Sequence, residues 1–188
     1  MGHHNLRGAN CFALHVEITH KNNLNLEINL NADIRTLNRL DSVCFDTVIH
    51  LAALVNVGES VRNPIGYYRT NLHGTENVLR KLQYKNFVFA STMEVYGWQL
   101  ISNEIKTFNK PLQNVIFDED TQPALNAPYA VAKYACEKYL EYMHRSQDFP
   151  FTSIRQTNSY GRKDNDFFVT EQIITQMLRY PNHIFLGE

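Results

Sequence analysis

The sequence has 188 residues, of which 44% are apolar and 20% are charged, enough for one globular domain and unlike a disordered or collagenous chain. Its 18 basic and 19 acidic residues leave a net charge of −1, which predicts no nucleic-acid partner and no anionic membrane partner. Three widely spaced cysteines without a CxxC pair predict neither a disulfide frame nor a zinc site. Without a signal-peptide or membrane-spanning run, we expect a cytoplasmic protein, and we interpret residues 1–4 as a possible expression-tag remnant.

Strands and helices are predicted to alternate along the chain. Strict alternation of apolar and polar residues predicts a half-buried strand at Leu24–Leu30, and a run rich in β-branched residues predicts a parallel strand covered on both faces at Asp46–Ala53. The later predicted elements are a helix from Pro64 to about Leu82, a strand at Asn86–Ser91, a helix at Tyr129–Arg145, a strand at Phe151–Arg155, a helix at Phe167–Arg179 and a strand start at Ile184–Leu186.

This order predicts an α/β fold with a doubly wound parallel sheet, built as one Rossmann-like domain over residues 1–188. Ligands of such sheets bind at the carboxyl ends of the strands, which directs attention to Leu51–Glu59, Ser91–Gly97 and Gln156–Asp164. The polar stretch Trp98–Pro128 has no clear period and is interpreted as a functional lid or a simple insertion.

Tyr129 and Lys133 stand four residues apart, which places both on one face of the predicted helix. A neighbouring ammonium favours the phenolate, so Lys133 is expected to bring the pKa of Tyr129 into a range useful for a general acid or base. The alternative is a packed tyrosine beside a lysine whose stem covers apolar surface.

Thr92 follows a predicted strand, where its hydroxyl can hydrogen-bond a substrate oxygen. A threonine, a tyrosine and a lysine together suit hydride chemistry on a carbinol, with a nicotinamide cofactor accepting the hydride. The alternative for Thr92 is a helix cap or a turn residue.

Several motifs in a fixed order carry a resemblance to a known family. From Asp33 to Glu188 the sequence resembles the extended short-chain dehydrogenase/reductase superfamily of sugar-nucleotide-modifying enzymes, which includes the NAD-dependent epimerase/dehydratase family. The matching segments are Asp33-Ile34-Arg35, His50-Leu51-Ala52-Ala53, Asn71-Leu72-His73-Gly74-Thr75, Ser91–Gly97, Tyr129–Lys133 and Arg155–Gly161.

The resemblance implies a bound NAD and a nucleotide-sugar substrate. For the cofactor, it implies that Asp33 and Ile34 border the adenine and that Leu51, Ala52 and Ala53 line the pyrophosphate and ribose. Thr92, Tyr129 and Lys133 are implied to be catalytic, and the last two also contact the cofactor. Asn71 is implied to support the site, and Asn158 to face the sugar nucleotide. The alternative for Asn71 and Asn158 is ordinary capping or turn bonding.

Two subgroups of the superfamily compete. Val57–Tyr68 resembles the corresponding stretch of UDP-galactose 4-epimerases, which implies epimerisation of a UDP-hexose at C4 through a transient 4-keto intermediate. Thr92-Met93-Glu94 is similar to a segment of nucleotide-sugar 4,6-dehydratases and UDP-glucuronate decarboxylases, in which the glutamate acts as a base, so Glu94 is also a catalytic candidate. Met93 stands where the dehydratases carry an acid and cannot donate a proton.

Other features leave a noncatalytic binding or scaffold protein open. No glycines form the family's GxxGxxG turn, and its faint echo at Gly8–Phe12 has Cys11 where a glycine belongs. Only 23 residues precede Leu24, so we expect an incomplete first βαβ unit. The resemblance further implies a C-terminal substrate-binding part beyond Glu188 and a homodimer formed through a four-helix contact of the Pro64–Leu82 and Tyr129–Arg145 helices. The histidines lack metal-site spacing, and we interpret His50 as a packed strand residue.

Overall fold

The computed structural model describes residues 13–19, 25–38, 44–97, 117–159 and 169–180. The chain divides into two compact units, Met1–Arg155 and Gln156–Glu188, which we describe separately. Within the described ranges no helix is long and apolar enough to cross a membrane.

The first unit begins with an antiparallel hairpin. Strand β1 (Ala13–Thr19) pairs with β2 (Asn25–Asn31) in a register that runs from Ala13 opposite Asn31 to Thr19 opposite Asn25. The strand predicted at Leu24–Leu30 is therefore confirmed, whereas β1 was not predicted. Only residues 20–24 separate the two strands, too few for the crossover helix that a parallel pair requires. Within the described residues, β1 and β2 therefore form a hairpin and not part of a βαβ unit, which agrees with the expected incomplete first unit.

A three-stranded parallel sheet forms the centre of this unit. Its strands are β3 (Cys44–His50), β4 (Gln83–Ala90) and β5 (Phe151–Ile154), hydrogen-bonded in the order β3-β4-β5. All three strands were predicted, and their parallel pairing confirms the α/β class. The carboxyl ends of β3, β4 and β5 therefore meet at one edge of the sheet.

The first crossover consists of α1 (Val57–Arg62), α2 (Pro64–Tyr67), the π-helix η1 (Tyr68–His73) and α3 (Gly74–Lys81). The helix predicted from Pro64 to about Leu82 is found in extent, with a π-helical stretch inside it, and α1 was not predicted. Two asparagines start these helices, because the side chain of Asn56 accepts from Glu59 N at 2.9 Å and that of Asn63 from Gly66 N at 3.1 Å.

The second crossover consists of the 3-10 helix η2 (Met93–Tyr96) and the long helix α5 (Pro128–Gln147). Pro128 suits the first turn of α5, where a backbone N–H has no partner in the helix. The helix ends at Asp148, which adopts a left-handed conformation with φ of 54° and donates its N–H to His144 O at 2.9 Å. The helix predicted at Tyr129–Arg145 is therefore confirmed.

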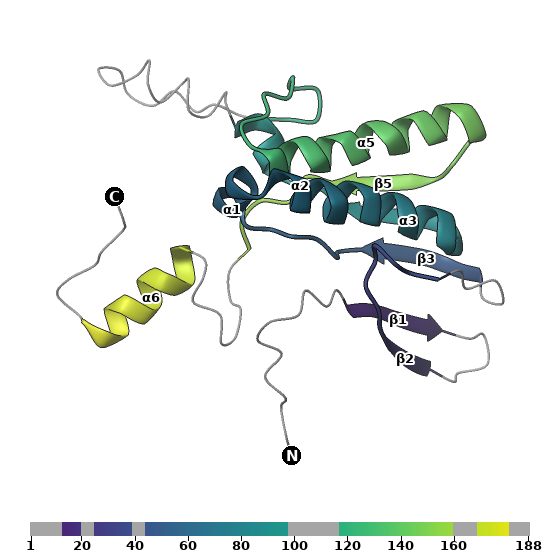
Figure 1. Ribbon diagram of the computed structural model, residues 1–188, viewed down its shortest axis with the longest axis horizontal. Helices are drawn as coiled ribbons and strands as arrows, with labels where there is room; N and C mark the ends of the chain where they lie inside the picture. Colours follow the sequence, from purple (N-terminus) through teal and green to yellow (C-terminus); the bar gives the residue numbers. More distant parts are fainter. Residues whose placement is uncertain (1–12, 20–24, 39–43, 98–116, 160–168, 181–188) are drawn as a thin grey trace. The chain divides into compact units, whose positions relative to one another are not determined.

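The helices of both crossovers lie over the same face of the parallel sheet (Figure 1). This follows from the strand order, because two successive right-handed crossovers that advance in one direction place their helices on one side. The core between sheet and helices contains Ile34, Leu37, Phe45, Val48, Val78, Leu79, Leu82, Phe87, Phe89, Cys136 and Leu140.

The side chains on the other face of the sheet are more exposed. Ile49 is 64% exposed and Ile154 is 48% exposed, although their strand neighbours are buried or half-buried. The expectation that Asp46–Ala53 is covered on both faces is therefore wrong for the described part of the chain, where both crossover helices fall on the same side.

The second unit contains α6 (Val169–Arg179), which confirms the helix predicted at Phe167–Arg179. Four expectations fall outside the described residues, entirely or in large part: the Gly8–Phe12 turn with Cys11, most of the Trp98–Pro128 stretch, the Tyr160-Gly161 end of the Arg155 motif, and the strand start at Ile184–Leu186.

Candidate active site

Thr92 lies two residues after the end of β4, at the carboxyl edge of the parallel sheet. Its backbone is extended, and its side-chain oxygen accepts a hydrogen bond from Glu94 N at 3.2 Å, so Thr92 is the N-cap of η2. The cap predicted as the alternative is therefore present. It does not exclude the functional interpretation, because the cap uses the oxygen as an acceptor and leaves the hydroxyl hydrogen to donate elsewhere.

Tyr129 and Lys133 occupy successive turns at the start of α5, and both are buried. The Thr92 side chain is near enough to the Tyr129 phenol to lower its pKa by hydrogen bonding, so the two predicted hydroxyls lie in the same region of the site. Its ring also packs edge-on against Tyr67 of α2, with the ring centroids 6.4 Å apart and the planes at 90°. Both the η2 segment and the first crossover therefore hold the phenol in place.

The electrostatics of Tyr129 differ from the expectation. Burial raises the pKa of Tyr129, the Thr92 hydrogen bond lowers it, and the negative charge of Glu94 raises it further. The net pKa shift is upward, so the lowering expected from Lys133 is not found. The reason is packing: the Lys133 ammonium donates to Ala90 O at 2.7 Å and lies 4.8 Å from the centroid of the Phe89 ring.

Lys133 is only 3% exposed, and burial lowers its pKa to about 8. Its charge also acts on His50 at the end of β3, where burial first and Lys133 second lower the pKa to about 3. His50 Nε2 lies 2.9 Å from Thr75 Oγ1, and that hydroxyl donates to Asn71 O at 2.6 Å. Thr75 therefore accepts from His50, which fixes a neutral imidazole with its proton on Nε2.

His50 is thus a satisfied core residue, as interpreted from the sequence. Among the residues that the structure describes, no three His, Cys, Asp or Glu side chains are grouped to hold a metal ion. Cys44 and Cys136, the two described cysteines, are both free thiols.

Asn71 lies in the π-helical stretch and is almost completely buried. Its amide nitrogen donates to Leu54 O and its amide oxygen accepts from Leu54 N, both at 2.8 Å. Its own carbonyl accepts from Thr75 Oγ1 and from Cys136 Sγ, the latter at 3.3 Å. Asn71 therefore fixes the loop after β3 and joins it to α5, and π-helical turns of this kind often occur at functional sites.

The loop that Asn71 fixes begins with the predicted cofactor-binding residues. Leu51 is 68% exposed, and Ala52 and Ala53 are half-buried directly after β3. Small side chains at the carboxyl end of a parallel strand allow a ligand to approach the backbone closely.

The residues predicted to border the adenine have different environments. Arg35 Nε contacts both carboxylate oxygens of Asp33 at 2.9 and 3.0 Å, and this hydrogen bonding lowers the pKa of Asp33. The Ile34 side chain is fully buried beneath Gly74, so only its backbone is available to a ligand. Asn158 belongs to the second unit, where it is exposed, and its contact with a sugar nucleotide stays a prediction.

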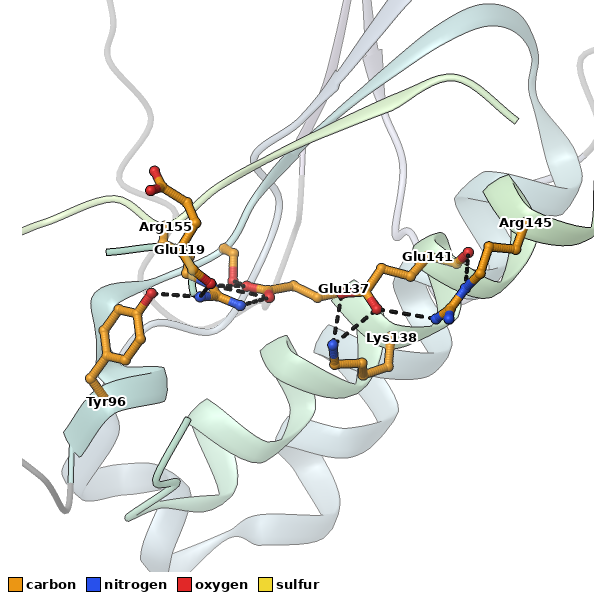
Figure 2. Close-up of polar contacts among 8 residues, drawn as sticks. Tyr96, Glu119, Glu137, Lys138, Glu141, Arg145 and Arg155 are labelled. Atoms are coloured by element: carbon orange, nitrogen blue, oxygen red, sulfur yellow. Dashed lines mark hydrogen bonds and ion pairs between the residues drawn. The ribbon is translucent and has the colours of Figure 1, made fainter. Parts of the chain in front are cut away.

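A buried ion pair that the sequence did not suggest joins α5 to the end of β5. Glu137 of α5 bonds Arg155, which directly follows β5 (Figure 2). Glu137 is four residues after Lys133, so the helical spacing that singled out Tyr129 and Lys133 also indicates this position.

Comparison with known families decides which group of proteins this chain represents. A family described as "NAD dependent epimerase/dehydratase family" matches residues 4–183. The chain belongs to this family. The match spans the three parallel strands and every candidate site residue named above.

The individual relatives include both epimerases and dehydratases. The chain is 34% identical over 142 residues to a UDP-glucose 4-epimerase of Halalkalibacterium halodurans, covering 72% of this chain and 39% of that protein. It is 32% identical over 119 residues to a dTDP-glucose 4,6-dehydratase of Streptomyces niveus, covering 62% of this chain and 32% of that protein. The chain therefore spans less than half the length of either relative.

A solved epimerase/dehydratase structure agrees with the fold. The UDP-glucose 4-epimerase of Thermotoga maritima, solved with UDP-glucose, matches with a TM-score of 0.59 at 29% identity, covering 71% of this chain and 42% of that chain. The Rossmann-like fold predicted from the sequence is thereby confirmed.

The description of the family names NAD as its cofactor. The described residues suit the ribose and the neighbouring part of NAD. Lys133 carries three N–H donors, of which the bond to Ala90 uses one, so its ammonium suits a ribose hydroxyl. The small residues Ala52 and Ala53 suit close approach of the cofactor to the loop after β3.

Proposed function

We propose that the protein interconverts the C4 epimers of a UDP-hexose through a transient 4-keto sugar. The observation that carries this proposal is the contact between Thr92 and Tyr129 at the carboxyl edge of the sheet, with Lys133 on the next helical turn. Two hydroxyls and one ammonium on fixed elements suit the removal and return of a proton at a sugar hydroxyl.

The roles follow from the bonding of each group. The Thr92 oxygen accepts from Glu94 N, and its one hydroxyl hydrogen turns from Tyr129 to the C4 oxygen when the sugar is bound. The Tyr129 phenol is neutral near pH 7 and gives a proton to the keto oxygen when the alcohol is restored; as phenolate it takes the hydroxyl proton in the opposite direction. Lys133, one turn further along α5, keeps two N–H donors besides the one that binds Ala90 O, so we assign it to the nicotinamide ribose and not to lowering the Tyr129 pKa.

NAD, when bound, supplies the acceptor and donor for the hydride of C4. We propose that Lys133 and Tyr129 hold its nicotinamide ribose, that the loop Leu51–Ala53 lines its pyrophosphate and ribose, and that Asp33 and the Ile34 backbone border its adenine. Asn71 supports the loop through Leu54.

The choice of epimerisation is supported by the segment whose sequence resembles the 4-epimerases. That segment, Val57–Tyr68, forms α1 and α2, and its Tyr67 ring packs directly against the ring of Tyr129. The epimerase-like residues are therefore part of the wall that positions the proposed acid and base.

Incubation of the NAD-loaded whole protein with UDP-glucose, and separately with UDP-galactose, tests the proposal. Epimerisation brings both reactions to the same mixture of the two sugars. In D2O the carbon-bound hydrogen at C4 is retained, because the hydrogen removed from C4 returns to C4. Failure to form the second sugar from either substrate by NAD-loaded protein contradicts the proposal.

Glu94 favours a second candidate, decarboxylation of UDP-glucuronate. Its carboxylate raises the pKa of Tyr129 by its charge, so Glu94 belongs to the same end of the sheet as the proposed acid and base. A 4,6-dehydratase is less well supported, because Met93 cannot supply an acid proton. Release of CO2 from UDP-glucuronate, without turnover of UDP-glucose, identifies the decarboxylase, whereas saturable NAD uptake without any turnover identifies a binding or scaffold protein.

We also propose that two copies pair through the helices of Pro64–Leu82 and Tyr129–Arg145. Large apolar side chains are exposed on both, including Ile65 at 58% and Tyr142 at 61%. Light scattering on the purified protein measures the mass directly, and a monomer at micromolar concentration contradicts the proposal.

A further inference from the structure

The Glu137 carboxylate is buried and engaged on both of its oxygens. Arg155 Nη2 donates to Oε2 at 2.8 Å, and Nε lies 3.2 Å from Oε1 and 3.1 Å from Oε2, so the guanidinium grips the carboxylate with two of its nitrogens. The Ser91 hydroxyl donates to Oε1 as well. With these bonds made, Glu137 has no role as a proton donor or acceptor in the proposed reaction.

Arg155 extends the same network to η2. Its Nη1 donates to the Tyr96 hydroxyl at 2.5 Å and to Glu119 O at 3.3 Å (Figure 2). The Tyr96 hydroxyl in turn donates to Asp118 O at 2.7 Å. The guanidinium carbon also lies 5.2 Å from the centroid of the Tyr96 ring. Glu137 and Tyr96 together raise the pKa of Arg155 further, so it carries its charge at every working pH.

The two contact points of this network lie on either side of the proposed catalytic segment. Ser91 immediately precedes Thr92, and Tyr96 is the last residue of η2. Glu94 lies between them. A single carboxylate–guanidinium pair therefore fastens both ends of the Thr92–Val95 segment.

The carboxylate of this pair belongs to the helix that carries Tyr129 and Lys133. The three residues are spaced by four, so they share one face of α5. The pair consequently joins the element that presents the Thr92 hydroxyl to the element that presents the Tyr129 phenol.

We propose that Glu137 and Arg155 are positioning residues that fix the Thr92 hydroxyl relative to the Tyr129 phenol. The inference rests on the proposed function, because the distance between these hydroxyls matters for turnover only if both act on one substrate oxygen. Displacement of a reacting group by about 1 Å lowers turnover by roughly a hundredfold.

Kinetics on the NAD-loaded whole protein provide the first test. Glu137→Gln keeps an oxygen for Ser91 but turns an amide toward Arg155, and we expect kcat to fall roughly 10- to 100-fold while KM changes less than about threefold. Arg155→Lys keeps the charge and should recover part of the loss seen in Arg155→Gln. The matched control is Glu141→Gln, which removes exposed ion pairs with Lys138 and Arg145 on the next turn of the same helix and should leave kcat within about twofold (Figure 2).

A double variant separates positioning from stability. Glu137→Gln/Arg155→Gln leaves no buried charge without its partner, so its thermal midpoint should recover toward the wild-type value. We expect kcat to stay low, because the guanidinium that donates to the Tyr96 hydroxyl is missing. Recovery of kcat in parallel with the midpoint would show a purely structural pair and overturn the proposal.

Two measurements test the proposal without turnover. Ultraviolet titration, taken as the difference between each protein and its Tyr129→Phe form, should give a higher Tyr129 pKa in Glu137→Gln than in wild type, because the Thr92 hydrogen bond is weakened. Amide exchange at Glu94 and Gly97 should quicken at least tenfold, while exchange in α3 is unchanged. If wild type turns over no nucleotide sugar, the proposed function fails and these two measurements decide the positioning role; an unchanged Tyr129 pKa with unchanged exchange overturns it.

Discussion

The side-chain amide of Asn71 holds both backbone groups of Leu54, the N–H and the carbonyl, each at 2.8 Å. An amide is the one neutral side chain that offers a donor and an acceptor side by side, so it substitutes for a neighbouring strand at the end of β3. The loop after β3 therefore has its shape set by a residue 17 positions further along the chain.

Replacement of Asn71 by alanine removes both bonds to Leu54 and leaves two half-buried backbone groups without them. We expect a loss of about 1–3 kcal/mol in the free energy of unfolding, measured by urea denaturation. Asn86→Ala is the control, because Asn86 makes one exposed bond to Asp46 O at 3.1 Å and its loss should cost under about 1 kcal/mol. Equal losses in the two variants would contradict a special role for Asn71 in holding the loop.

Tyr129→Phe removes the proposed acid and base while the ring still packs against Tyr67. We expect kcat for UDP-hexose epimerisation to fall about 10²- to 10⁴-fold, because the proton transfer is lost. NAD uptake should weaken far less, because Lys133 and the loop Leu51–Ala53 still hold the cofactor. Tyr142→Phe, on an exposed part of the same helix, serves as the control and should keep wild-type kcat. Parallel loss of NAD uptake and turnover in Tyr129→Phe would assign Tyr129 to binding alone.

His50 makes stability depend on acidity. Burial, with a smaller contribution from Lys133, lowers its pKa from 6.5 to about 3, so the folded protein resists protonation that the unfolded chain accepts. The resulting stability is complete above pH 6.5 and is lost as the pH falls toward 3, amounting to about 2 kcal/mol by pH 5.

Comparison with His50→Gln measures this contribution, because glutamine can still donate to Thr75 but does not titrate. Between pH 7.5 and pH 5, we expect wild type to lose about 2 kcal/mol more unfolding free energy than His50→Gln. His73→Gln, at an exposed position, is the control for replacing a histidine outside the core. A gap in unfolding free energy that is constant with pH would mean that His50 takes up a proton as readily in the folded protein as in the unfolded chain.

Gly74 marks a close approach of α3 to the core. A Cβ placed there would lie 2.6 Å from Ile34 Cδ1 and 2.8 Å from Ile34 Cγ1, and Ile34 is fully buried. Gly74→Ala should therefore destabilise the protein by about 1–3 kcal/mol, despite the better helix propensity of alanine.

Gly58→Ala is the matched control, because a Cβ there meets only an ordinary contact of 3.6 Å with Asn56. It should be neutral or stabilising by up to about 1 kcal/mol. Ile34→Val removes the atom closest to the new methyl group and should recover part of the loss in the double variant. Destabilisation by Gly74→Ala that is unaffected by Ile34→Val would place the conflict elsewhere.

Local sequence patterns predicted the elements whose signals lie within one segment. The apolar runs of β3 and β4 and the long helix α5 are of this kind. Thr92 was grouped with Tyr129 and Lys133 because a hydroxyl, a phenol and an ammonium together suit hydride chemistry, and because the family resemblance implies the same three residues. Strand β1 was missed although Leu14, Val16 and Ile18 alternate with polar residues, because a first strand followed by a helix was expected.

Properties that depend on tertiary packing were not predictable in the same way. The direction of the Tyr129 pKa shift is set by burial and by Glu94, neither of which is encoded in the spacing of Tyr129 and Lys133. The pairing of Glu137 with Arg155 joins residues 18 positions apart on a helix and at the end of a strand, and only the docking of α5 on β5 brings them together.

The way α5 is attached to the sheet affects the order in which the site forms during folding. Three of the bonds that attach α5 are Lys133 to Ala90, Glu137 to Ser91 and Cys136 to Asn71, which span 43, 46 and 65 residues of sequence. Contacts of such separation form late, because long loops must close before they bring any gain. During synthesis, Ala90, Ser91 and Asn71 therefore leave the ribosome before the α5 residues that they bind, and the Glu137–Arg155 pair forms only once Arg155 has also emerged.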